Sequence, residues 1–248
     1  MSVYKEQVVD ELSRWKRKMM KRQSMTGRYA KKIQTKVNQF VPEKVHTVVT
    51  TSVKNMVHAT LIGSEYTAKK QPLLEGNLQE REEFIQQTIE RYKKTAAAEG
   101  AGTGVGGIFL GLVDFPLLLG IKMKMLFDIA SLYGFDVKDY RERLFVLHLF
   151  QLAFSSEEKK KEVFELIENW EDYVKQFPER KEYLKQLDWK SFQLEYRDHI
   201  DLPKLFQLIP GFGAIVGATV NYHFLDVLGE TAKNGYRMRI LEQKALPM

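Results

Sequence analysis

Two apolar stretches rich in glycine, residues 100–114 and 209–220, constrain the fold of this 248-residue chain more than any other feature. In both stretches small residues recur four positions apart: Gly102 with Gly106, Gly107 with Gly111, and Gly213 with Gly217. On a helix this spacing makes a flat strip against which another backbone packs closely. Each glycine inside a helix costs roughly 1 kcal/mol relative to alanine, so such a run needs a compensating contact. We therefore expect two helices that pack on each other or on lipid, with a ligand or lipid groove along the glycines.

Apolar residues recur with helical spacing along most of the chain, and no segment alternates as a half-buried strand does. The sequence therefore predicts an all-α protein. The expected helices are residues 3–22, 26–40, 43–62, 78–98, 116–133, 138–154, 157–175 and 210–241. The β-branched residues of 43–62 could also suit a strand, but their spacing favours a helix. Gly134 is a natural end for the helix before it.

Positive charge is concentrated at the N-terminus. The chain has a formal net charge of +6, yet residues 1–44 contain 12 Lys or Arg and only 4 Asp or Glu, so the remainder is slightly acidic. Residues 3–22 predict a basic amphipathic helix. Its apolar stripe consists of Tyr4, Val8, Leu12, Trp15 and Met19. We accordingly divide the chain into basic N-terminal helices, residues 1–42, and a helical domain, residues 43–248.

A basic helix with an indole beside its apolar stripe is suited to an anionic membrane surface. The residues expected to bind that surface are Arg14, Trp15, Arg17, Lys18 and Lys21. The alternative is that this helix simply packs on the protein's own core. Nucleic acid is not an expected partner, because no reading helix or aromatic sheet is recognisable. The charged N-terminus lacks the apolar region of a secretory signal, which predicts a cytoplasmic location, and the absence of cysteine excludes disulfides and thiolate metal sites.

Neither glycine-rich stretch is expected to span a bilayer. A span needs about 20 mostly apolar residues, and the best window, residues 101–121, contains Asp114 and Pro116 near its middle. A carboxylate at mid-bilayer costs roughly 2.5–3.5 kcal/mol. We therefore expect a hairpin buried in protein, with a hairpin partly inserted into lipid as the alternative.

No motif indicates catalysis, a metal or a cofactor, and none is expected. The glycine pattern at 102–107 matches the dinucleotide-binding pattern, but that pattern requires a preceding strand where this chain predicts a helix. Asp114, among apolar neighbours, is either a site carboxylate or the N-cap of the next helix. Asp226 and Glu230 lie one helical turn apart and would face Asp114 if the glycine helices pack together. These three carboxylates are the candidates for the alternative hypothesis of a hydrolase.

Several motifs, in order along the chain, resemble the EcsC family. They are Ala98-Glu-Gly-Ala-Gly-Thr-Gly-Val-Gly-Gly107, Asp114-Phe-Pro116, Ala130-Ser-Leu-Tyr-Gly-Phe-Asp136, Ile209-Pro-Gly-Phe-Gly-Ala214, Asn221-Tyr222, Asp226, Gly229-Glu-Thr-Ala232 and Tyr236-Arg237. The resemblance covers roughly residues 40–240. It implies a bacterial protein associated with an ABC-exporter operon that also encodes an ATPase and a membrane subunit. It supplies no agreed catalytic residues.

The leading hypothesis is a non-enzymatic helical accessory protein on the inner face of the cytoplasmic membrane. It would bind lipid, or an apolar membrane partner, through the groove between the glycine helices, and ABC transporter subunits are possible partners. The alternatives are the hydrolase and a soluble protein-interaction scaffold.

Overall fold

The computed structural model describes residues 3–20, 43–62, 72–73, 75–104, 115–155, 157–176 and 213–243. The regular structure of these residues is entirely helical, which confirms the all-α prediction. The helices are α1 (Val3–Met19), α3 (Glu43–Ile62), α4 (Leu78–Gly104), α6 (Phe115–Leu132), α7 (Tyr140–Phe154), α8 (Glu157–Glu168), α9 (Trp170–Val174) and α12 (Gly213–Gln243). The helix expected at residues 26–40 lies outside the described residues.

The helix ends follow local chemistry in most places. Gly134 ends α6 with a φ of 91°, and the N–H of Phe135 donates to the carbonyl of Ala130 over 3.0 Å, so its predicted role as a helix end is confirmed. The single helix expected over 157–175 is wrong. It is broken at Asn169, whose side-chain amide donates to the Glu165 carbonyl over 2.8 Å and so competes with the backbone pattern.

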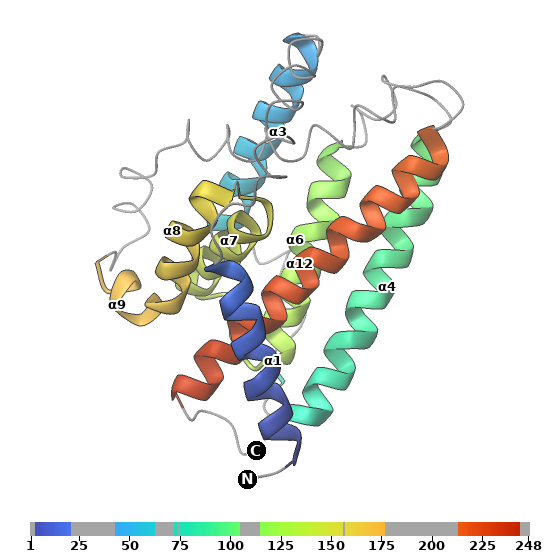
Figure 1. Cartoon of the computed structure of the whole chain (residues 1–248). Coiled ribbons are helices and arrows are strands. Elements are labelled where there is room, and N and C mark those ends of the chain that lie inside the picture. The colour runs from blue at the N-terminus through green and yellow to red at the C-terminus, as the bar shows by residue number, and fades with distance from the viewer. Residues whose placement is uncertain are drawn as a thin grey trace.

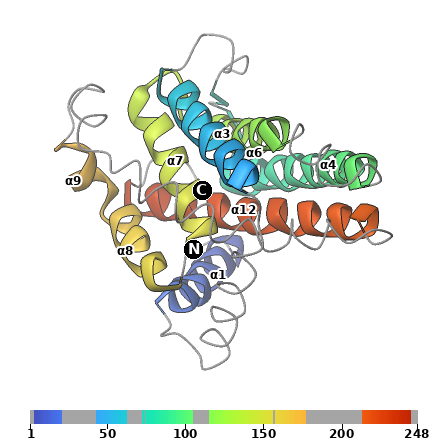
Figure 2. The same ribbon diagram turned by 90° about the horizontal axis from the view of Figure 1, so that it is seen from above.

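Two long helices, α4 and α12, run antiparallel and lie side by side in both views (Figure 1, Figure 2). The shorter α6 packs against α4, and α7 packs against α12. α3 contacts α6 and α7 from the side opposite α1, while α1 packs on α12 and α8. The molecule is therefore a helical bundle built around the α4–α12 pair.

The seam between α4 and α12 is where close backbone packing was expected. Gly102 belongs to α4, and Gly213 and Gly217 belong to α12. The glycines at 106, 107 and 111 lie outside the described residues, so the packing of the two glycine strips stays a prediction. Within the described residues, α12 approaches α4 closely at Gly229, where an added Cβ would lie 2.9 Å from two atoms of Ile89 on α4.

The apolar stripe of α1 faces the protein. Trp15 is only 4% exposed and meets the ring of Phe164 edge-on at 5.6 Å between centroids. Trp15 thus packs α1 against α8, as the alternative of a helix packed on the protein's own core expects, and its role at a membrane surface stays a prediction. Residues 21–42 lie outside the described residues, so the division into 1–42 and 43–248 stays a prediction.

His148 on α7 gives a prediction for stability against pH. Its ring meets Trp170 and Tyr173 edge-on, and burial lowers the pKa of His148 from 6.5 to about 4. Below pH 6.5 the unfolded chain binds more protons at this residue than the folded protein, so stability falls as the pH drops from 6.5 towards 4. Between pH 7.5 and 5 we expect urea denaturation to show wild type losing about 2 kcal/mol more than His148→Gln. Equal losses in the two proteins would contradict this.

Candidate functional site

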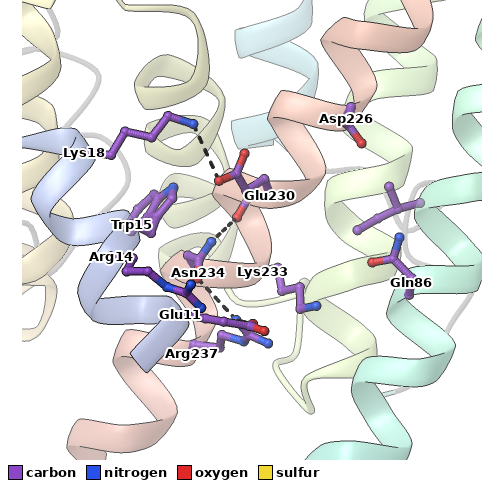
Figure 3. Close-up of a pocket in the computed structure, with 11 residues that line it drawn as sticks. Glu11, Arg14, Trp15, Lys18, Gln86, Asp226, Glu230, Lys233, Asn234 and Arg237 are labelled. Atoms are coloured by element: carbon purple, nitrogen blue, oxygen red, sulfur yellow. Dashed lines mark hydrogen bonds and ion pairs between the residues drawn. The ribbon is translucent and has the colours of Figure 1, made fainter. Parts of the chain in front are cut away.

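A cavity of about 370 Å³ lies between α1, α4 and α12 (Figure 3). Its lining residues are Glu11, Arg14, Trp15 and Lys18 from α1, Gln86 and Ile89 from α4, and Asp226, Glu230, Lys233, Asn234 and Arg237 from α12. Cavities of this size accommodate small-molecule ligands. The lining is mainly charged and carries both signs, which is unusual for a simple packing defect.

Helical spacing explains why these side chains meet. Residues three or four positions apart on a helix share one face. Asp226, Glu230, Lys233 and Arg237 follow this spacing on α12, so they form one charged strip. The lining residues of α1 have the same spacing, and the cavity forms where the two strips face each other.

A buried ion pair joins Arg237 of the cavity lining to Glu82. Glu82 and Arg237 are 2% and 3% exposed, and Arg237 grips both carboxylate oxygens of Glu82 from Nε at 2.7 Å and Nη2 at 2.5 Å. The hydroxyls of Tyr4 and Tyr133 donate to the same carboxylate over 2.6 and 3.0 Å. Burial alone would raise the pKa of Glu82, but the hydrogen bonds and charge of Arg237 outweigh it and lower that pKa. Both oxygens of the Glu82 carboxylate therefore accept hydrogen bonds. Arg237 also donates a hydrogen bond to Glu11 over 2.8 Å.

Lys233 lies farther from Glu82 than Arg237 does. Its Nζ lies 3.8 Å from Glu82 Oε2, which is longer than a direct hydrogen bond. Burial lowers the pKa of Lys233, the positive charge of Arg237 lowers it further, and Glu82 and Glu11 oppose both effects. A positive group with three donors thus borders the cavity, next to a carboxylate that other groups already satisfy.

Four further ion pairs lie around the cavity. Lys93 donates to Asp226 over 2.7 Å and to Glu90 over 2.8 Å, with its ammonium 4.3 Å from the Tyr222 ring centre. Lys18 approaches Glu230 at 3.7 Å. Arg14 pairs with Asp10 at 3.2 Å, and both side chains are more than half exposed. The Arg14 and Lys18 pairs are solvated and weak, so these groups can reorient at little cost.

The structure brings together residues that were predicted for separate purposes. Asp226 and Glu230, the hydrolase candidates, line the same cavity as Arg14 and Lys18, the membrane-binding candidates. Asp114 and Lys21 lie outside the described residues, and Arg17 is exposed away from the cavity lining. Among the described residues, no cluster of His, Asp or Glu is arranged to hold a metal ion.

Three important residues were not predicted from the sequence: Glu82, Lys233 and Arg237. Glu82 sits in a run of charged residues, Glu80-Arg81-Glu82-Glu83, of which Arg81 and Glu82 are buried, and nothing local in the sequence indicates which ones. Lys233 and Arg237 could have been found from their spacing. They follow Asp226 and Glu230 along the sequence at helical intervals and so extend the charged strip of α12.

The fold and the cavity define an all-helical protein with a small, mixed-charge site beside its N-terminal helix. The chain belongs to the EcsC protein family, whose sequence pattern matches residues 6–241. It is 52% identical to Protein EcsC of Bacillus subtilis (strain 168) over 238 residues, which cover 96% of this chain and 97% of that protein. It is also 35% identical over 150 residues to the same organism's Uncharacterized protein YdbA, covering 60% of this chain and 54% of that protein. No solved structure matches this chain.

Membership of the EcsC family confirms the resemblance found in the motifs. In the described part of the chain, no helix is both long enough and apolar enough to cross a bilayer.

Proposed function

We propose that this protein is a peripheral accessory protein on the inner face of the cytoplasmic membrane, linked to an ABC exporter system, that binds anionic lipid through the outer face of α1. The exporter link rests on the resemblance to EcsC proteins. The lipid contact rests on the side chains that α1 leaves exposed.

The exposed face of α1 carries the proposal. Val9 and Met20 are 40% and 43% exposed. Met20 directly follows α1 and its N–H donates to the Lys16 carbonyl over 3.1 Å, so a separation of eleven positions places the two on one side. Arg17 is exposed on the adjoining side. Exposed apolar groups beside a cation are what a helix lying in a lipid interface presents. Trp15 is buried against protein, and Arg17, two positions further on, lies on nearly the opposite side of the helix and is exposed.

Charge reversal at Arg17 tests the lipid contact. Each basic residue near an anionic leaflet contributes about 1 kcal/mol, so Arg17→Glu should weaken binding to anionic vesicles by about thirtyfold at low salt. High salt should shrink the difference. Co-sedimentation with vesicles measures it, and Arg141→Glu at the exposed start of α7 is the matched control. Equal binding of wild type to neutral and anionic vesicles would count against the proposal.

The two alternatives remain hypotheses. Asp226 and Glu230 are each ion-paired with a lysine, and no described contact aligns them for hydrolysis. A protein-interaction scaffold would instead capture partners without lipid and ignore vesicles, an outcome that the same co-sedimentation assay would reveal.

A further inference from the structure

We propose that the cavity between α1, α4 and α12 binds a zwitterion that carries an ammonium group and a phosphate or carboxylate group. Such a ligand can be a free solute or the headgroup of a lipid. Only the lipid source rests on the proposed membrane function, because the cavity itself is independent of the outer face of α1.

The anionic group of the ligand would meet Lys233. Both oxygens of Glu82 already accept hydrogen bonds from Arg237 and the two tyrosines, and Lys233 Nζ stands 3.8 Å away. The ammonium of Lys233 therefore has hydrogen-bonding capacity that Glu82 does not take up. Since burial and the charge of Arg237 disfavour its ammonium form, a bound anion beside Lys233 would relieve that penalty.

The ammonium group of the ligand would meet Glu230 and Asp226. Glu230 is one turn before Lys233 on α12, yet the two side chains are directed to different partners: Glu230 to Lys18 at 3.7 Å and Lys233 to Glu82 at 3.8 Å. Both distances exceed a direct hydrogen bond. The cavity therefore has a positive group and a negative group, each with unused hydrogen-bonding capacity, on one wall (Figure 3).

The mixed lining argues against a ligand of one sign. A simple anion would bring its charge close to Asp226 and Glu230, and a simple cation would bring its charge close to Lys233 and Arg14. Like-charge contacts of this kind discriminate strongly between ligands. A zwitterion avoids both, and the apolar surfaces of Trp15 and Ile89 in the lining suit the short methylene chain between its two charges.

Calorimetric titration of the full chain with phosphoethanolamine, inorganic phosphate and ethanolamine tests the chemistry. We expect saturable binding of phosphoethanolamine, with phosphate and ethanolamine each at least tenfold weaker. Lys233→Met and Glu230→Gln should each weaken phosphoethanolamine binding by about tenfold. The matched controls are Lys161→Met and Glu162→Gln, which change exposed charges on α8 and should have no effect.

Glu230 is about half exposed, so Glu230→Gln keeps the test valid even if Lys233→Met impairs folding. Phosphate binding as tightly as phosphoethanolamine would overturn the proposal, as would phosphoethanolamine affinities that both variants leave unchanged.

Vesicles separate the two sources of ligand. Phosphatidylcholine vesicles with and without phosphatidylethanolamine have the same net charge, but only the ethanolamine group donates hydrogen bonds to a carboxylate. If the headgroup belongs to a lipid, phosphatidylethanolamine should increase binding, and Glu230→Gln should abolish that increase. If it is a free solute, only the calorimetric signal should respond. No response to phosphoethanolamine in either assay would overturn the proposal, whereas loss of anionic-vesicle binding in Arg17→Glu reports on the proposed function alone.

Discussion

Glu82→Gln should destabilise the protein by about 3–5 kcal/mol, because it removes one partner of a buried ion pair and leaves the other charge uncompensated. Arg237 is only 3% exposed and donates to both oxygens of Glu82, so water cannot replace the lost carboxylate. Urea denaturation at pH 7 measures the change. Glu230→Gln removes a carboxylate from the same cavity, but that side chain is 48% exposed, so its cost should stay within about 0.5 kcal/mol.

A double replacement distinguishes the loss of a partner from the loss of the ion pair itself. Glu82→Met combined with Arg237→Met removes both charges of the pair together, so it should cost less than either single change. The pKa of Glu82 is lowered in the folded protein, so the carboxylate's stabilising contribution is present above its unfolded pKa and is lost as the pH falls through the folded pKa. Wild-type stability for Glu82→Gln would show that the pair is not buried as described.

Helix positions were predictable because their signals are local. The spacing of Val8, Leu12, Trp15 and Met19 predicts α1 without knowledge of its neighbours, and Gly134 ends α6 through its own backbone conformation. The break at Asn169 is a departure from helical backbone angles at a single residue, with φ −105° and ψ 35°. The same pattern of polar and apolar residues is compatible with a continuous helix.

The cavity was only partly predictable because it depends on how helices dock. Spacing placed Asp226 and Glu230 on one face of a helix, and charge singled out Arg14 and Lys18, but nothing local indicated that α1 packs across α12. The importance of Glu82 emerges only from partners 78 and 155 residues away in the chain, Tyr4 and Arg237. Such contacts are set by tertiary packing, which periodicity does not specify.

Gly229→Val should destabilise the protein by about 3 kcal/mol, because it forces α4 and α12 apart at the most extensive helix contact among the described elements. A Cβ at Gly229 would lie 2.9 Å from both Cγ2 and Cδ1 of Ile89. Ile89 is 3% exposed, and its β-branching leaves few alternative rotamers in a helix. Thermal or urea denaturation measures the loss.

Gly120→Ala on α6 is the matched control, since a Cβ there would meet nothing within 4 Å. Alanine favours a helix interior over glycine by roughly 0.5–1 kcal/mol, so this change should stabilise the protein. Gly229→Ala should gain the same stability from helix propensity, but the clash with Ile89 should cancel that gain. Ile89→Ala removes the clashing side chain, so the double variant Gly229→Ala/Ile89→Ala should be more stable than the sum of the two single changes predicts. If Gly229→Ala stabilised the protein as much as Gly120→Ala does, α4 and α12 would not approach as closely at Gly229 as the structure has them.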